Sequence, residues 1–139
     1  MSAFHSFRVS ASGLTAERLR MDTISNNLAN ANTTRTEDGG PYRRQFVLFS
    51  AIDNGASAAG QQPGHGVRVV AIGEDESAPR LIFDPQHPDA NAEGYVAMPN
   101  VHVVKEMVDL ISATRSYEAN ITAINAAKSM AQKALEIGR

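Results

Sequence analysis

The 139-residue sequence contains no cysteine and no tryptophan. Without cysteine the chain cannot form a disulfide, a thiolate metal site or a cysteine nucleophile, although this leaves its redox compartment open. Aromatic residues make up only 6% of the chain, against 42% apolar residues in total, which is enough for a modest core. The length fits one domain, or one small domain with a helical stalk.

The sequence also lacks a run of 18 apolar residues, and it therefore predicts no membrane insertion. Residues Met1–Val9 show no basic segment followed by an apolar one, so no secretory signal peptide is expected. If the protein acts outside the cytoplasm, it must leave by a route that reads no such signal. The net charge of −2 gives no indication of nucleic-acid binding, and the cluster of Arg35, Arg43 and Arg44 is interpreted as a solvated loop.

Sequence motifs of common active sites are missing, among them GxSxG, HExxH, GxxxxGKS and GxGxxG. Asp84, His87 and Asp89 have the residue types of a metal site, and a metal-dependent enzyme built on them is the alternative from a different function class. Pro85 and Pro88 interrupt this segment and favour a turn instead. We therefore expect no catalytic residue, no metal site and no cofactor.

The most informative stretch runs from Asn100 to Ile137, where apolar residues recur at alternating intervals of three and four. No glycine or proline interrupts it before Gly138, so the pattern predicts a helix. A helix of about 35 residues is about 50 Å long, too long for the core of a compact domain. A second apolar row follows the same stretch, and a helix that is apolar on two faces needs more than one neighbour. The alternative is an alanine-rich helix that packs only on its own domain.

A second helix is predicted from Phe4 to about Ala31, weakened in its first turns by Gly13. Between the two helices, runs of branched and aromatic residues predict short strands at 42–50, 67–72, 80–83 and 94–97. The turn at 53–55 and the loop at 56–66 separate the first two strands.

These patterns predict an α+β fold in which long N- and C-terminal helices pair as a coiled-coil-like stalk, with a small antiparallel β insert between them. We divide the chain into an N-terminal helix at 1–34, a β-rich insert at 35–99 and a C-terminal helix at 100–139. Apolar residues of the two helical rows are the predicted assembly interface: Leu14, Met21, Leu28, Val104, Met107, Leu110, Tyr117, Ile121, Ile124 and Leu135.

Four segments carry a resemblance to a known family. Ser25–Asn30 followed by Thr33 resembles the N-terminal signature of bacterial flagellar rod and hook proteins, and 100–120 resembles their C-terminal signature. The segments around Pro41 and around 84–101 resemble the proximal rod members of that family. Residues 35–40 stand between the Asn32-Thr33 segment and Pro41, as in the proximal rod form, and the sequence does not predict the path of this loop. The residues that carry the resemblance are Asn27, Leu28, Ala29, Asn30, Thr33, Tyr42, Arg43, Met98, Pro99, Asn100, Glu106, Met107, Arg115, Tyr117, Glu118 and Asn120.

The resemblance implies a structural subunit and not an enzyme. Members of this family are exported by the flagellar type III apparatus without a cleaved signal peptide, and assemble in the periplasm into the helical tube of the basal-body rod, which transmits torque. The implied partners are further copies of the chain, other flagellar rod proteins, the rod-to-ring adaptor at the base and the export apparatus. Another subunit of the same tube is the alternative within this class.

Overall fold

The computed structural model describes residues 3–52 and 64–138. Two long helices, α1 (Ala3–Ala29) and α2 (Val103–Ile137), run antiparallel, and four strands lie between them in the chain. The strands are β1 (Gln45–Ala51), β2 (Val67–Glu74), β3 (Arg80–Phe83) and β4 (Tyr95–Met98). The predicted fold class, a helical stalk with antiparallel strands inserted, is therefore confirmed.

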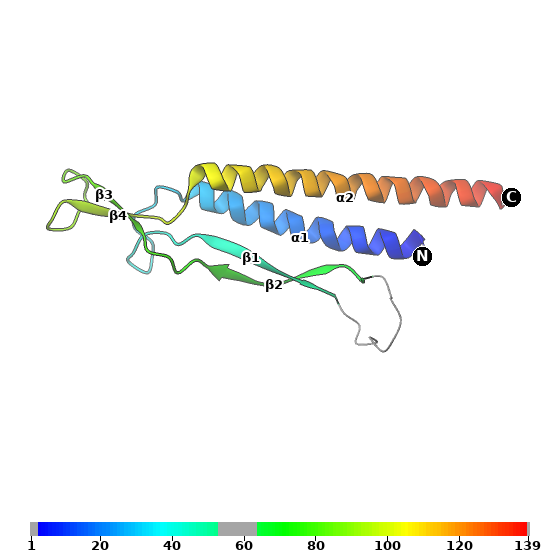
Figure 1. Ribbon diagram of the computed structural model, residues 1–139, viewed down its shortest axis with the longest axis horizontal. Helices are drawn as coiled ribbons and strands as arrows, with labels where there is room; N and C mark the ends of the chain where they lie inside the picture. The colour runs from blue at the N-terminus through cyan, green and yellow to red at the C-terminus, as the bar shows by residue number, and fades with distance from the viewer. Residues whose placement is uncertain (1–2, 53–63, 139) are drawn as a thin grey trace.

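Helix α1 is the middle layer of the stalk. It packs against α2 on one side and against the β1–β2 hairpin on the other, whereas α2 packs against no strand in the described part of the chain. One long side of α2 is consequently left without a neighbour (Figure 1). No described helix is long and apolar enough to cross a membrane.

The two helices meet through residues spaced in heptads. At one end the Asn27 side chain donates a hydrogen bond to Glu106, and two heptads further along, Gly13 lies against Asn120. A methyl group added at Gly13 would stand 3.0 Å from the amide of Asn120, so the absent side chain is what permits this approach. Ala113 and Ala127, one heptad to either side of Asn120, are buried on the same face of α2.

This contact row differs from the predicted one. Leu110, Tyr117 and Ile124 are partly buried as expected. The other predicted members of the α2 seam are exposed, at 76% for Val104, 53% for Met107, 38% for Ile121 and 74% for Leu135. They lie outside the closest contact with α1, because the helices approach most closely where side chains are small and not where they are most apolar. A role between subunits stays a prediction for them.

On α1 the predicted residues Leu14, Met21 and Leu28 are partly buried. The fully buried positions are a mixed set: Ala16, Thr23, Ile24 and Asn27. Helix α1 continues through Gly13 without a break, so the glycine does not interrupt the first turns.

The strands form two separate antiparallel hairpins and not one sheet. β1 pairs with β2 from Gln45↔Glu74 to Ala51↔Val67, with an irregularity between Leu48 and Phe49, and β3 pairs with β4. The β3–β4 hairpin lies beyond the end of the helix pair (Figure 1). The predicted turn at 53–55 and most of the predicted loop at 56–66 fall in 53–63, outside the described residues. The division of the chain at 34 and 99 also stays a prediction.

The start of β2 is attached directly to α1. The backbone N–H of Val67 donates to the Ser12 hydroxyl at 3.1 Å, and that hydroxyl donates to the carbonyl of Val9. Gly66 adopts φ of +113°, and a Cβ there would lie only 2.3 Å from Ser12 Oγ. Glycine is required at this position by both its backbone conformation and its close approach to α1.

Candidate functional site

Buried polar side chains gather where the end of α1, the start of β1 and the start of α2 meet. We call Asn27, Tyr42, Arg44, Asn100 and Glu106 the polar hub. Asn27 is fully buried, and every hydrogen-bonding position of its amide is used. Its Nδ2 donates to the carbonyl of Gln45 at 2.8 Å and to Glu106 at 3.0 Å, while its Oδ1 accepts from the Gln45 N–H and the Tyr42 hydroxyl, each at 2.9 Å.

Glu106 brings a charge into the hub from the first turn of α2. Its side chain is 0% exposed, with one carboxylate oxygen bound by Asn27 and the other by Arg44 Nε at 2.5 Å. The Arg44 Nη2 also lies 3.9 Å from Asp109, one turn further along α2. A buried carboxylate needs this pairing, because an unpaired buried charge strongly destabilises a fold.

Asn100 joins the hub to the segment after β2. Its Oδ1 accepts from the backbone N–H of Arg44 at 2.8 Å, and its Nδ2 donates to the carbonyls of Asp75 and Ser77 and to the Ser77 hydroxyl. The backbone N–H of Asp75 returns to the carbonyl of Arg44 at 2.8 Å. One asparagine before α2 therefore holds three chain segments together.

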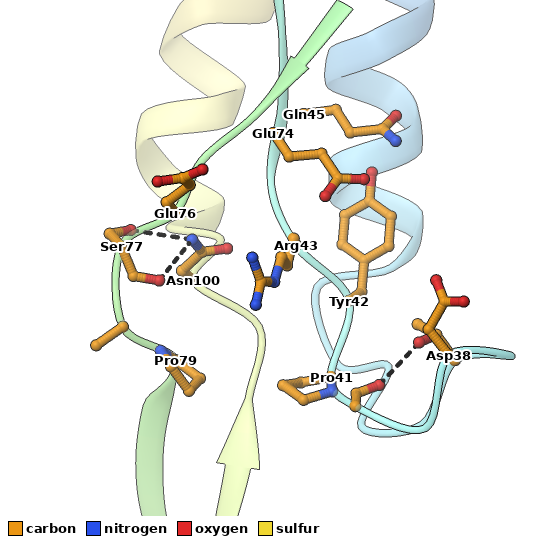
Figure 2. Close-up of a pocket in the computed structure, with 13 residues that line it drawn as sticks. Asp38, Pro41, Tyr42, Arg43, Gln45, Glu74, Glu76, Ser77, Pro79 and Asn100 are labelled. Atoms are coloured by element: carbon orange, nitrogen blue, oxygen red, sulfur yellow. Dashed lines mark hydrogen bonds between the residues drawn. The ribbon is translucent and has the colours of Figure 1, made fainter.

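Tyr42, one of the hub residues, also lines an open cavity of about 560 Å³. Figure 2 shows this cavity between Tyr42, Arg43 and Asn100, with Glu74 and Glu76 at its rim. Burial, reinforced by the negative charges of Glu106 and Glu74, raises the pKa of the Tyr42 hydroxyl above its usual value of 10.0. The phenol therefore stays protonated and serves as a hydrogen-bond donor to Asn27.

Comparison with known proteins agrees with the two terminal segments singled out in the sequence. Residues 7–35 match the family described as flagella basal body rod protein, and residues 92–137 match the family described as flagellar basal body rod FlgEFG protein C-terminal. The flagellar basal-body rod protein FlgC of Bacillus subtilis (strain 168) is 55% identical, covering 100% of both chains. The chain belongs to the FlgC family of flagellar basal-body rod proteins.

Other FlgC relatives are similar over the same extent. The flagellar basal-body rod protein FlgC of Borreliella burgdorferi is 48% identical over 99% of this chain and 98% of its own. The FlgC protein of Salmonella typhimurium is 42% identical over 100% of both chains. The similarity therefore includes the strands between the helices as well as the two helices themselves.

The residues that carried the family resemblance fall into three places. Asn27, Tyr42, Asn100 and Glu106 are brought together in the hub, and Asn120 lies against Gly13 in the middle of the stalk. Asn30 and Thr33 bond to each other where α1 ends, and the Pro99 carbonyl accepts from Arg80. The remaining motif residues do not join the hub: Leu28, Ala29, Arg43, Met98, Met107, Arg115, Tyr117 and Glu118.

Arg44 is the hub residue that sequence reasoning missed. The cluster containing it was interpreted as a solvated loop, but the Arg44 side chain is only 18% exposed and pairs with Glu106. The interpretation was wrong for this residue because net charge says nothing about which charges find buried partners. Glu106, an acid among valines at the start of α2, is the signal that a cation must be near.

The segment containing Asp84, His87 and Asp89 forms a turn. Asp84 accepts from the N–H of Gln86, and His87 Nδ1 accepts from the N–H of Asp89. The Asp89 carboxylate is itself bound by the Thr34 hydroxyl and by Arg35, which ties this turn to the segment after α1. Within residues 3–52 and 64–138, no group of three histidine or acidic side chains is placed to hold a metal ion.

Large apolar side chains are exposed at several places, among them the β1–β2 hairpin with Leu48, Phe49, Val70 and Ile72. The outer face of α2 exposes Val104, Met107, Val108, Ile111, Ile121, Met130, Leu135 and Ile137. The β3–β4 hairpin exposes Leu81, Ile82, Phe83 and Tyr95. Extended apolar surfaces of this kind are typical of proteins that bind other proteins.

Proposed function

We propose that the chain is a structural subunit of the proximal rod of the flagellar basal body. In this role it packs with further copies of itself and with other rod proteins into a helical tube, which passes torque from the motor to the distal rod and hook. The observation that carries the proposal is the exposed apolar face of α2, on the side of the helix that no other element in the described part of the chain covers. The full-length similarity to FlgC proteins supports the same role.

The predicted assembly interface fits this proposal in a modified form. Val104, Met107, Ile121 and Leu135 are exposed in the single chain and available to neighbouring subunits. Leu14, Met21, Leu28, Leu110, Tyr117 and Ile124 are already partly covered within the chain. They would contribute to assembly mainly by supporting the helix pair.

Location and partners follow from the same role. We propose that the chain is exported by the flagellar type III apparatus without a cleaved signal peptide and reaches the periplasmic part of the rod. The rod-to-ring adaptor at its base is a further proposed partner. No catalytic role is proposed, because Asp84, His87 and Asp89 are occupied in a turn and in contacts with Thr34 and Arg35.

The substitution Ile121→Asp tests the interface. Ile121 is 38% exposed and does not belong to the closest α1 contact, so the purified variant should lose less than about 1 kcal/mol of stability. In the assembled rod, a carboxylate buried in an apolar contact costs several kcal/mol, roughly 2 or more. Cells carrying the variant should export it and yet build no hook and not swim.

Asn125→Asp, one turn further along α2 at an exposed polar position, is the matched control. It introduces the same charge, and it should leave swimming intact. If Ile121→Asp cells assemble complete rods, or if both variants fail alike, the outer face of α2 is not a specific subunit interface.

A further inference from the structure

The helices of the stalk approach most closely along a row made largely of small side chains. Gly13, Ala113 and Ala127 have little or no side chain, and Asn120 bonds back to the carbonyl of Ser116 on its own helix. Small residues allow the helices to pack closely, but because their side chains are so similar in shape they do not favour one helix register over another. Sliding α2 by one heptad would place Ala113 or Ala127 opposite Gly13, which is sterically at least as easy as the observed pair.

The polar hub is different, because its bonds can form in one register only. Glu106 meets Asn27 and Arg44 at the same time, and Asn27 meets both the Gln45 backbone and Glu106. A shift of one heptad moves α2 by about 10 Å along α1 and separates all of these partners. Glu106 would then be a charge on the inner face of α2 without its two partners, which is strongly unfavourable.

We propose that the polar hub fixes the register of α1 against α2, and that Asn27 and Glu106 are its specificity-determining residues. A single buried polar position is known to select the register of paired helices at some expense of stability. Here the hub also includes β1, through Gln45 and Arg44, so the same residues set the level of the β1–β2 hairpin along the stalk. The inference concerns the fold of the single chain and does not depend on its assembly into the rod.

Disulfide trapping tests the register directly, because the chain has no cysteine of its own. The observed register is reported by Gly13→Cys with Asn120→Cys, and shifted registers by Gly13→Cys with Ala113→Cys or with Ala127→Cys. A disulfide needs Cα atoms about 4.4–6.8 Å apart, so a displacement of one heptad is clearly distinguished. Each pair is introduced into the purified full-length chain, oxidised at low protein concentration, and scored as intramolecular product.

With the hub intact, the 13–120 pair should cross-link and both shifted pairs should give less than a tenth of its yield. With Asn27→Leu and Glu106→Leu together, at least one shifted pair should rise to a yield within threefold of the 13–120 pair. Val96→Ala, a cavity at a buried position outside the helix pair, is the control for loss of stability alone, and it should leave the ratio of yields unchanged.

Four results would overturn the proposal, three from the cross-linking yields and one from circular dichroism. Shifted pairs could form with the hub intact, the 13–120 pair could remain dominant without it, or the Val96→Ala control could shift the ratio as much as the hub variant. Glu106→Gln keeps the shape of the side chain, and its shifted yield should lie between those of the other two backgrounds. If both hub variants lose their helical circular dichroism, the hub is required for folding in general and the proposal of a register role fails.

Discussion

Removal of the Asn27 side chain should damage the protein far more than its size suggests. Asn27→Ala deletes four hydrogen bonds at a fully buried position. Tyr42 keeps the hydrogen bond that its hydroxyl accepts from Asn26, and Glu106 keeps Arg44, so the groups left without a partner are chiefly the backbone N–H and C=O of Gln45. An orphaned buried polar group costs about 1–3 kcal/mol, so the two groups together give a loss of roughly 2–6 kcal/mol for the variant. Domains of this size are stable by about 5–15 kcal/mol, so much of the stability would be lost.

The measurement is urea unfolding of the purified chain, followed by circular dichroism at 222 nm. Asn26→Ala is the matched control, since this neighbouring asparagine is exposed, and its side chain donates to the Tyr42 hydroxyl at 3.0 Å and to the Gln45 side chain at 3.5 Å and accepts from Asn30 at 3.1 Å. It should cost less than about 1 kcal/mol. Asn27→Asp keeps the shape but replaces a donor to Glu106 with a second carboxylate, so at neutral pH it should be at least as damaging as alanine. A loss below about 1 kcal/mol for Asn27→Ala, or equal losses at the two asparagines, would refute this account of the hub.

Three further outcomes are expected. Gly13→Ala alone should increase the stability of the chain only slightly, because the new methyl group meets the Asn120 amide at 3.0 Å. In an Asn120→Ala background the same change should add the ~1 kcal/mol by which alanine is preferred over glycine in a helix, measured by urea unfolding. The Thr34 hydroxyl, assisted by Arg35, holds the pKa of Asp89 below its usual value of 3.8. The contact therefore stabilises the fold above about pH 4, and this stabilisation is lost as the pH falls through the lowered pKa. Thr34→Val should move the pKa of Asp89, measured by carboxyl NMR, back towards 3.8. Amide exchange should be slowest in the parts of α1 and α2 beside the hub. It should be fastest in the last two turns of α2, where nearly every side chain is exposed. Uniform protection along α2 would contradict this expectation.

The sequence was sufficient to predict the helices and strands, but not to predict which of their residues contact one another. Periodicity over more than four turns identified both helices, and for α2 the absence of glycine and proline before Gly138 left few other structures possible. It could not identify the contact row, since Gly13, Ala113 and Ala127 carry almost no hydropathy signal and act through the space that they leave. The predicted apolar rows followed the large side chains, and Met107, Ile121 and Leu135 of those rows are exposed in the single chain.

The contacts among the hub residues could not be predicted from the sequence either. Asn27, Tyr42, Asn100 and Glu106 were singled out through family resemblance, and no local rule indicated that residues so far apart in the chain share one network. Arg44 was missed because its partner lies 62 residues away. The four strands were predicted, but the sequence did not indicate that they form two separate two-stranded sheets.

The distribution of side chains along the stalk reverses the usual arrangement of a folded chain. Its most buried positions are mainly small and polar residues, with Ile24 an exception, while Val104, Met107, Val108 and Ile111 are exposed. Large apolar residues normally supply most of the free energy of folding, so a chain that exposes them forgoes that stabilisation until another surface covers them. Anything that binds only the folded form stabilises it by mass action, and neighbouring subunits would do so here. The hub can then be understood as the element that keeps the single chain correctly folded and correctly aligned before those contacts form.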